Sequence, residues 1–207
     1  MKISSKIPIL VFLSIFFVAG SISPALSQDE KVRAKIGIKI KSGDRVVRAK
    51  SRDRLKAGDL LRIYVHPEGS SYIYVVHSDK KTVTLLNIVE QKIQGSTLVL
   101  PSVQEFYQVD GGSPVETFTI ICSPSELSDV SSILSSNMSH EKWTAIEKQL
   151  IEKSKIVLTQ KNENPFAIAG NVRGGIGPGN GDPFVSKLQI FSGKSFLVKR
   201  YEFKVKK

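Results

Sequence analysis

Hydrophobic and polar residues alternate along much of the first half of the chain. Between residues 60 and 66, leucine, isoleucine and valine alternate with polar or aromatic residues. Alternation with a period of two is typical of a strand with one buried face. Two further runs, 72–77 and 82–86, are rich in β-branched and aromatic residues, and short turn sequences separate the three runs. We therefore predict a three-stranded meander, in which the strands that end near His66 and His77 pair antiparallel.

A second alternating run lies nearer the N-terminus, where isoleucines at 36, 38 and 40 alternate with lysine and glycine. It predicts a strand with isoleucines inward and lysines outward, followed by a short strand around residues 46–47. Residues 31–54 hold ten basic residues and only two acids. The lysines either protect an exposed sheet edge or form an anion-binding stripe. The candidate binding surface is Lys35, Lys39, Lys41, Arg45, Arg48, Arg62 and Tyr64, and we expect Tyr64 to be exposed.

The pattern predicts further strands at residues 97–100, 106–109, 115–122, 156–159 and 195–205. The run 115–122 is apolar nearly throughout, which indicates a central strand buried on both faces. In the terminal strand the apolar positions change face between Val198 and Tyr201, which suggests a β-bulge.

Helical spacing appears only between residues 124 and 154. The sequence from Ser123 to Glu126 has the form of a capping box, which predicts a helix start. A second helix is predicted from Ser139, with an apolar stripe at Trp143, Ile146, Leu150 and Ile151. Its outer side carries mixed charges, Lys142, Glu147, Lys148, Glu152 and Lys153.

These elements predict a mainly antiparallel β-sandwich, immunoglobulin-like in general architecture, with a two-helix insertion at 124–154 packed on a sheet. The glycine-rich stretch 170–183 is expected to be a long flexible loop.

The first 27 residues have the organisation of a secretory signal peptide. Two lysines precede an apolar run that is too short to span a bilayer, and Ala25 and Ser27 suit a cleavage site. Cleavage would leave residues 28–207 as a single domain with a net charge of +9, against +11 for the whole chain, because residues 1–27 hold two lysines and no acid. We expect a periplasmic or extracellular protein that is not a lipoprotein and has no membrane span after cleavage.

No pattern of catalytic or metal-binding residues stands out. The single cysteine, Cys122, ends an apolar run and is expected to be a buried thiol. His140 lacks the second histidine of a zinc-protease helix, and His66 and His77, with neither a carboxylate nor a cysteine expected beside them in the fold, make a weak metal site. A Ser-His-Asp arrangement stays open, but no nucleophile elbow is present. The glycine loop lacks a dinucleotide fingerprint, so we expect no cofactor.

Residues 55–127 resemble a bacterial family catalogued as a domain of unknown function, number 4384. The resemblance rests on the runs Leu55–Asp59, Ser71–Val76, Val83–Leu86, Leu98–Pro101 and Glu116–Pro124. It departs from the family at Lys80–Lys81, where a glycine is usual, and at Asn87. Such domains occur in exported proteins and beside caspase-like or protein-kinase domains, so the resemblance implies an accessory or recognition module without catalytic residues.

Three functions are compatible with these features. The first is an exported, non-catalytic envelope module that binds a protein or an anionic polymer. The second is a small hydrolase or metal-dependent enzyme that uses His66, His77 or a pocket that the sequence does not reveal. The third is a structural subunit of an envelope assembly. Nucleic acid is a poor candidate partner, because no aromatic residues are interleaved with the charges of the basic stretch.

Overall fold

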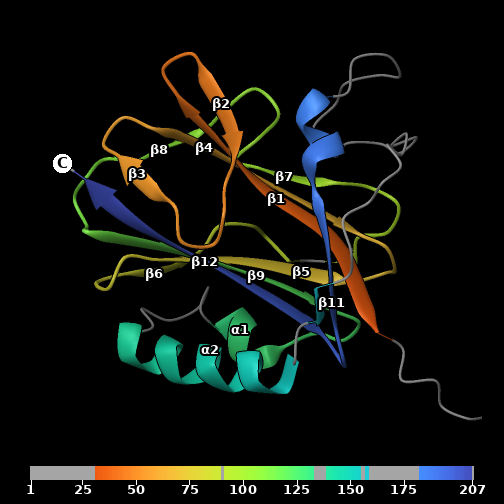
Figure 1. Cartoon of the computed structure of the whole chain (residues 1–207). Helices are drawn as coiled ribbons and strands as arrows, with labels where there is room; N and C mark the ends of the chain where they lie inside the picture. The colour runs from red at the N-terminus through yellow and green to blue at the C-terminus, as the bar shows by residue number, and fades with distance from the viewer. Residues whose placement is uncertain (1–30, 90, 133–138, 155–156, 159–181, 207) are drawn as a thin grey trace, which may run out of the picture.

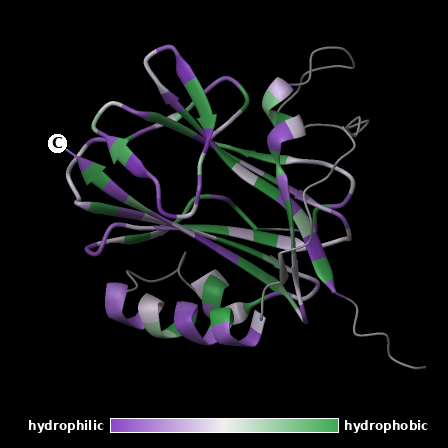
Figure 2. Cartoon of the chain, in the orientation of Figure 1, coloured by the Kyte–Doolittle hydropathy of each residue, from purple (hydrophilic) through white to green (hydrophobic). Residues whose placement is uncertain are grey.

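Two β-sheets pack face to face around one apolar core in the computed structural model (Figure 1), which describes residues 31–89, 91–132, 139–154, 157–158 and 182–206. This confirms the prediction of a mainly β sandwich with a helical insertion. Hydrophobic and hydrophilic residues alternate along the strands (Figure 2), as expected for sheets with one face toward the core. The predicted signal peptide and most of the glycine-rich stretch lie outside the described residues.

The first sheet contains, in spatial order, β10 (Val157–Leu158), β11 (Gln189–Gly193), β1 (Val32–Ser42), β4 (Leu60–Pro67) and β7 (Leu98–Leu100). In addition, β2 (Arg45–Arg48) pairs with β1, and β8 (Tyr107–Gln108) pairs with β4. The isoleucine face of β1 is buried, as predicted. Since β1 lies between β11 and β4, however, the interpretation of its lysines as protection of a sheet edge is wrong.

The second sheet contains β3 (Arg54–Lys56), β12 (Leu197–Lys206), β9 (Val115–Ser123), β5 (Tyr72–Ser78) and β6 (Val83–Leu85). The apolar strand β9 is central, as predicted, and Cys122 on it is fully buried. Strand β12 pairs with β9 without interruption, so the predicted bulge is absent. The apolar positions change face because Leu197 enters the core while Val198 packs under the helices.

The predicted meander is wrong in its pairing, although all three of its strands exist. Strands β4 and β5 belong to different sheets, because residues 68–71 carry the chain across the sandwich. Their apolar residues therefore meet through the core instead of along a hydrogen-bonded ladder. As a result, His66 and His77 are not neighbours.

Two helices, α1 (Ser128–Ser131) and α2 (His140–Ser154), follow β9. The predicted capping box is wrong, because Ser123 still belongs to β9 and the N–H of Leu127 donates to the Tyr74 hydroxyl at 2.8 Å. Helix α2 begins after Ser139, as predicted, and lies across the outer face of the second sheet (Figure 1).

Trp143 on α2 is buried against that sheet, as the predicted apolar stripe requires. Two other residues of the helix differ in burial from the prediction. Ile151 is exposed, whereas Glu147 is buried and accepts a hydrogen bond from the Thr119 hydroxyl. The Glu147 carboxylate also pairs with Arg200, with Nε and Oε2 3.3 Å apart. Among the described residues, no helix is long and apolar enough to cross a membrane.

Candidate functional site

Three residues of the predicted binding surface converge on one carboxylate, that of Asp182. The Lys39 ammonium lies 2.9 Å from Asp182 Oδ2, the Arg62 guanidinium lies 3.6 Å from it, and the Tyr64 hydroxyl donates to it. Arg62 also donates to the Glu105 carbonyl at 2.8 Å and stacks on the ring of Phe106, 3.8 Å from its centre. The guanidinium of Arg62 and the hydroxyl of Tyr64 are therefore engaged in contacts within the fold.

The Asp182 cluster holds a short helix on the outer face of the first sheet. Helix η2 (Pro183–Lys187) begins at Asp182, whose carboxylate accepts from the Phe184 N–H, and Phe184 packs on Tyr64. Gly37 leaves room for this layer, because a Cβ there would lie 2.7 Å from Leu188. Strand β4 is therefore buried on both faces rather than one, and Tyr64 is only 1% exposed, contrary to the prediction.

The electrostatics of the cluster favour an ionised Asp182. Burial alone raises the pKa of Asp182, but hydrogen bonds from Tyr64, Phe184 and Lys39 and the charge of Lys39 lower it below its ordinary value. Burial, together with the bond to Asp182, raises the pKa of Tyr64 well above its ordinary value. The cluster thus behaves as a structural ion pair and not as a site with a free charge.

The other predicted surface residues do not form one patch with these. Lys41 and Arg45 are exposed, and Arg48 donates to the carbonyl of Lys187 at 3.0 Å. Lys35 is partly buried, and this burial lowers its pKa. The surface predicted from the sequence is therefore divided between an internal cluster and scattered cations.

A different group of cations lies at the edge of the second sheet, where β3 pairs in parallel with the end of β12. In this register Lys204 is opposite Arg54 and Lys206 is opposite Lys56. All four side chains are exposed, while the intervening Leu55 is buried. We call these four residues the basic edge.

The basic edge has no acidic partner within the described chain. None of its four residues makes an ion pair there. Glu202 lies two residues before Lys204 on the same face of β12, but it is paired with Arg200 at 2.8 Å. The loop before β3 adds the exposed residues Lys50 and Arg52. This is a concentrated positive surface in which like charges are neighbours.

Sequence reasoning missed the basic edge because its two halves are far apart in the chain. Each half shows a weak signal, a basic–apolar–basic triplet at 54–56 and again at 204–206. Only the parallel pairing of β3 with β12 brings the two triplets into register.

A second feature is a cavity of about 180 Å³ between the ends of the two sheets, which we call the mouth cavity. It is lined by aromatic and titratable side chains, among them Tyr107, Phe118, His77, Glu116, Asp79 and Asp110. His77 Nε2 lies 2.5 Å from Glu116 Oε2, so the histidine predicted to lack a carboxylate has one. No cluster of three or more potential metal ligands occurs among the described residues.

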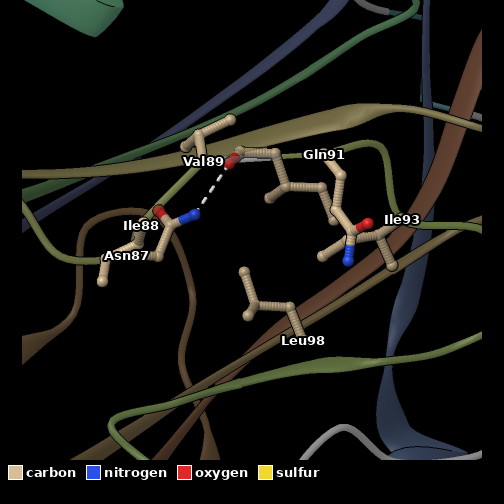
Figure 3. A pocket seen from close by; sticks show the side chains of 7 residues that line it. Asn87, Ile88, Val89, Gln91, Ile93 and Leu98 are labelled. Atoms are coloured by element: carbon tan, nitrogen blue, oxygen red, sulfur yellow. Dashed lines mark hydrogen bonds between the residues drawn. The ribbon is translucent and has the colours of Figure 1, made fainter.

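A third feature is a pocket of about 220 Å³ beside β5 (Figure 3). The Asn87 side chain at its rim accepts from the Val75 N–H at 2.9 Å and donates to the Ile73 carbonyl at 2.8 Å. Asn87 thus replaces a strand partner and closes this part of the β5 edge. Ile88, 78% exposed, also lines the pocket.

Comparison with known proteins adds no relative. No family model, no curated protein and no solved structure matches the chain. The resemblance of residues 55–127 to the domain family of unknown function therefore stays a prediction.

Proposed function

We propose that the chain is an exported, non-catalytic module that binds an anionic polymer of the cell envelope through the basic edge. The observation that carries the proposal is the register of β3 and β12, which places two pairs of exposed cations opposite each other. Like charges directly opposite each other destabilise a sheet. A bound polyanion relieves that repulsion, so binding also stabilises the fold.

Protection of the sheet edge does not account for all four cations. Arg54 and Lys56 lie on β3, which is at the edge of its sheet, and charges there discourage pairing with other chains. Lys204 lies where β12 is paired on both sides, with β3 and with β9, whereas Lys206 is paired with β3 and lies beyond the last β9 partner. The charge of Lys204 therefore adds repulsion without protecting an open edge, which favours a binding role.

The geometry favours a polymer over a folded protein partner. Successive outward residues on a strand are about 6.6 Å apart and neighbouring strands about 4.8 Å apart, so the four cations form a small regular array. A chain with repeated phosphate or carboxylate groups can engage such an array in several registers. Protein interfaces usually have an apolar centre, but the large hydrophobic residues exposed in the described chain, Val46, Ile88 and Ile151, lie outside the basic edge.

The hydrolase alternative has one observation in its favour, since Ser113 and His77 line the same cavity. The Ser113 hydroxyl lies 2.8 Å from the Asp79 carbonyl and 2.9 Å from the Val115 carbonyl, however, and makes no hydrogen bond with the imidazole. A nucleophile requires contact with its base, so we prefer the non-catalytic proposal.

Fluorescence anisotropy with labelled polyphosphate tests the proposal, with labelled neutral dextran as the control polymer. We expect polyphosphate to bind with an affinity that falls as salt is added, and dextran not to bind. Vesicles rich in phosphatidylglycerol form a second arm. Binding to these vesicles without binding to polyphosphate would replace the polymer with a membrane surface, and binding to neither would overturn the proposal.

A further inference from the structure

The mouth cavity has an excess of hydrogen-bond acceptors that are not used within the fold. Glu116 Oε2 contacts His77, while Glu116 Oε1 makes no hydrogen bond with the described residues. Asp79 and Asp110 each use Oδ1 in a turn, where it accepts backbone N–H groups, and each leaves Oδ2 unpaired in the described chain. Since no buried side-chain nitrogen or oxygen in the described part of the chain lacks a partner, these acceptors are open to solvent or to a ligand.

His77 adds a fourth acceptor with a defined orientation. Its imidazole packs against Phe118, with the ring centres 5.0 Å apart and the ring planes tilted by 38°, and its Nε2 contacts Glu116. In the neutral imidazole, a carboxylate at one ring nitrogen favours the tautomer with the proton on that nitrogen. In that tautomer the other nitrogen, Nδ1, carries a lone pair, and it has no hydrogen-bond partner among the described residues.

The walls of the cavity complement a compact cation. Leu61, Tyr107 and Phe118 supply apolar and aromatic surface, and faces of aromatic rings attract cations. Among the described residues no lysine or arginine lines the cavity, although the chain as a whole has a net charge of +11. The local charge is therefore opposite in sign to that of the chain.

We propose that the mouth cavity binds the guanidinium or ammonium group of a small organic cation. Such a group donates several hydrogen bonds and accepts none, which matches the unpaired acceptors Asp79 Oδ2, Asp110 Oδ2, Glu116 Oε1 and His77 Nδ1. Its alkyl part lies against Tyr107 and Phe118. The site is separate from the basic edge, which takes the opposite charge, so either proposal can fail without the other.

Titration of the wild-type protein with n-butylguanidinium, followed by NMR of the imidazole resonances, tests the proposal. The control ligand is n-butylurea, which has nearly the same shape without the charge. We expect the cation to shift the His77 resonances and to bind at least about tenfold more tightly than the urea, which corresponds to about 1.4 kcal/mol. Equal affinities, or no shift of the His77 resonances, would overturn the proposal.

A variant and a peptide complete the test. Glu116→Gln keeps the shape of the side chain and removes its charge, so it should weaken binding of n-butylguanidinium while polyphosphate binding is unchanged. Unchanged binding of n-butylguanidinium in the folded variant would contradict the site.

An acetylated, amidated Gly-Arg-Gly peptide carries the same guanidinium on a peptide. Stronger binding of this peptide than of n-butylguanidinium would identify an arginine side chain as the source of the cation, and weaker binding would identify a free small molecule.

Discussion

Lys204 on β12 lies directly opposite Arg54 on β3, and both side chains are exposed without an ion pair in the described chain. Lys206 and Lys56 repeat the arrangement two residues further along. Like charges in adjacent register positions oppose folding. The molecule therefore has a surface whose composition reduces stability, as is often found where a binding function constrains the sequence.

Reversing one of these charges should stabilise the protein. Lys204→Glu converts the pair with Arg54 from repulsive to attractive, which we expect to raise the free energy of unfolding by about 0.2–1 kcal/mol. Urea denaturation followed by the fluorescence of the single tryptophan, Trp143, measures this, because that side chain is buried in the fold. The control is Lys148→Glu on the exposed side of α2, which changes the net charge equally. A loss of stability in Lys204→Glu alone would contradict the repulsive pairing.

The Asp182 cluster should be important for stability. Asp182→Asn removes the charge that compensates Lys39 and Arg62, which are largely buried. We expect a loss of about 1–3 kcal/mol in the free energy of unfolding, less than for a fully buried pair because Asp182 is 22% exposed. Asp44→Asn, at an exposed turn, is the matched control and should change little. Equal unfolding curves for the two variants would show that the cluster adds no stability.

The same carboxylate gives a prediction about pH. Because the pKa of Asp182 is lowered in the folded state, its contribution to stability is fully present above its ordinary value of 3.8 and is lost as pH falls through the lower folded value. The stability difference between wild type and Asp182→Asn should therefore be constant near neutral pH and shrink in acid below about pH 4. Urea denaturation of both proteins at a series of pH values measures it, and a difference that grows in acid would contradict the assignment.

Gly193 should be intolerant of any side chain. It ends β11 at the tight connection to β12, and a Cβ there would lie 2.0 Å from the carbonyl oxygen of Phe196. Since a backbone atom cannot move aside as a side chain can, we expect Gly193→Ala to cost at least about 1–3 kcal/mol in the free energy of unfolding. Gly69→Ala, where a Cβ meets no atom within 4 Å, is the control. Thermal unfolding that is equal in both variants would contradict this close approach.

Period-two alternation predicted the strands well, but it could not assign them to sheets. The alternation in β4 and β5 reports which residues face the core, and that burial is the same whether the strands pair or lie in opposite sheets. The burial of Tyr64 depends on η2, a segment far along the chain. In the same way, Glu147 is buried because Thr119 and Arg200 reach it from other strands.

The sequence predicted that the candidate site is a basic surface, but not which residues form it. The abundance of basic residues correctly suggested a positively charged exterior. It did not reveal which cations are neutralised, since Asp182 pairs with Lys39 across a long stretch of sequence. It also did not reveal the parallel register that gathers the basic edge.

The most direct test of the account compares two variants of equal charge for binding to labelled polyphosphate. One is Lys204→Glu/Lys206→Glu in the basic edge, and the other is Lys142→Glu/Lys148→Glu on the exposed side of α2. We expect the edge variant to lose at least about tenfold in affinity, since each cation near an anionic surface contributes about 1 kcal/mol, and the helix variant to lose much less. Equal losses in the two variants would mean that only net charge matters and would contradict a binding site at the basic edge.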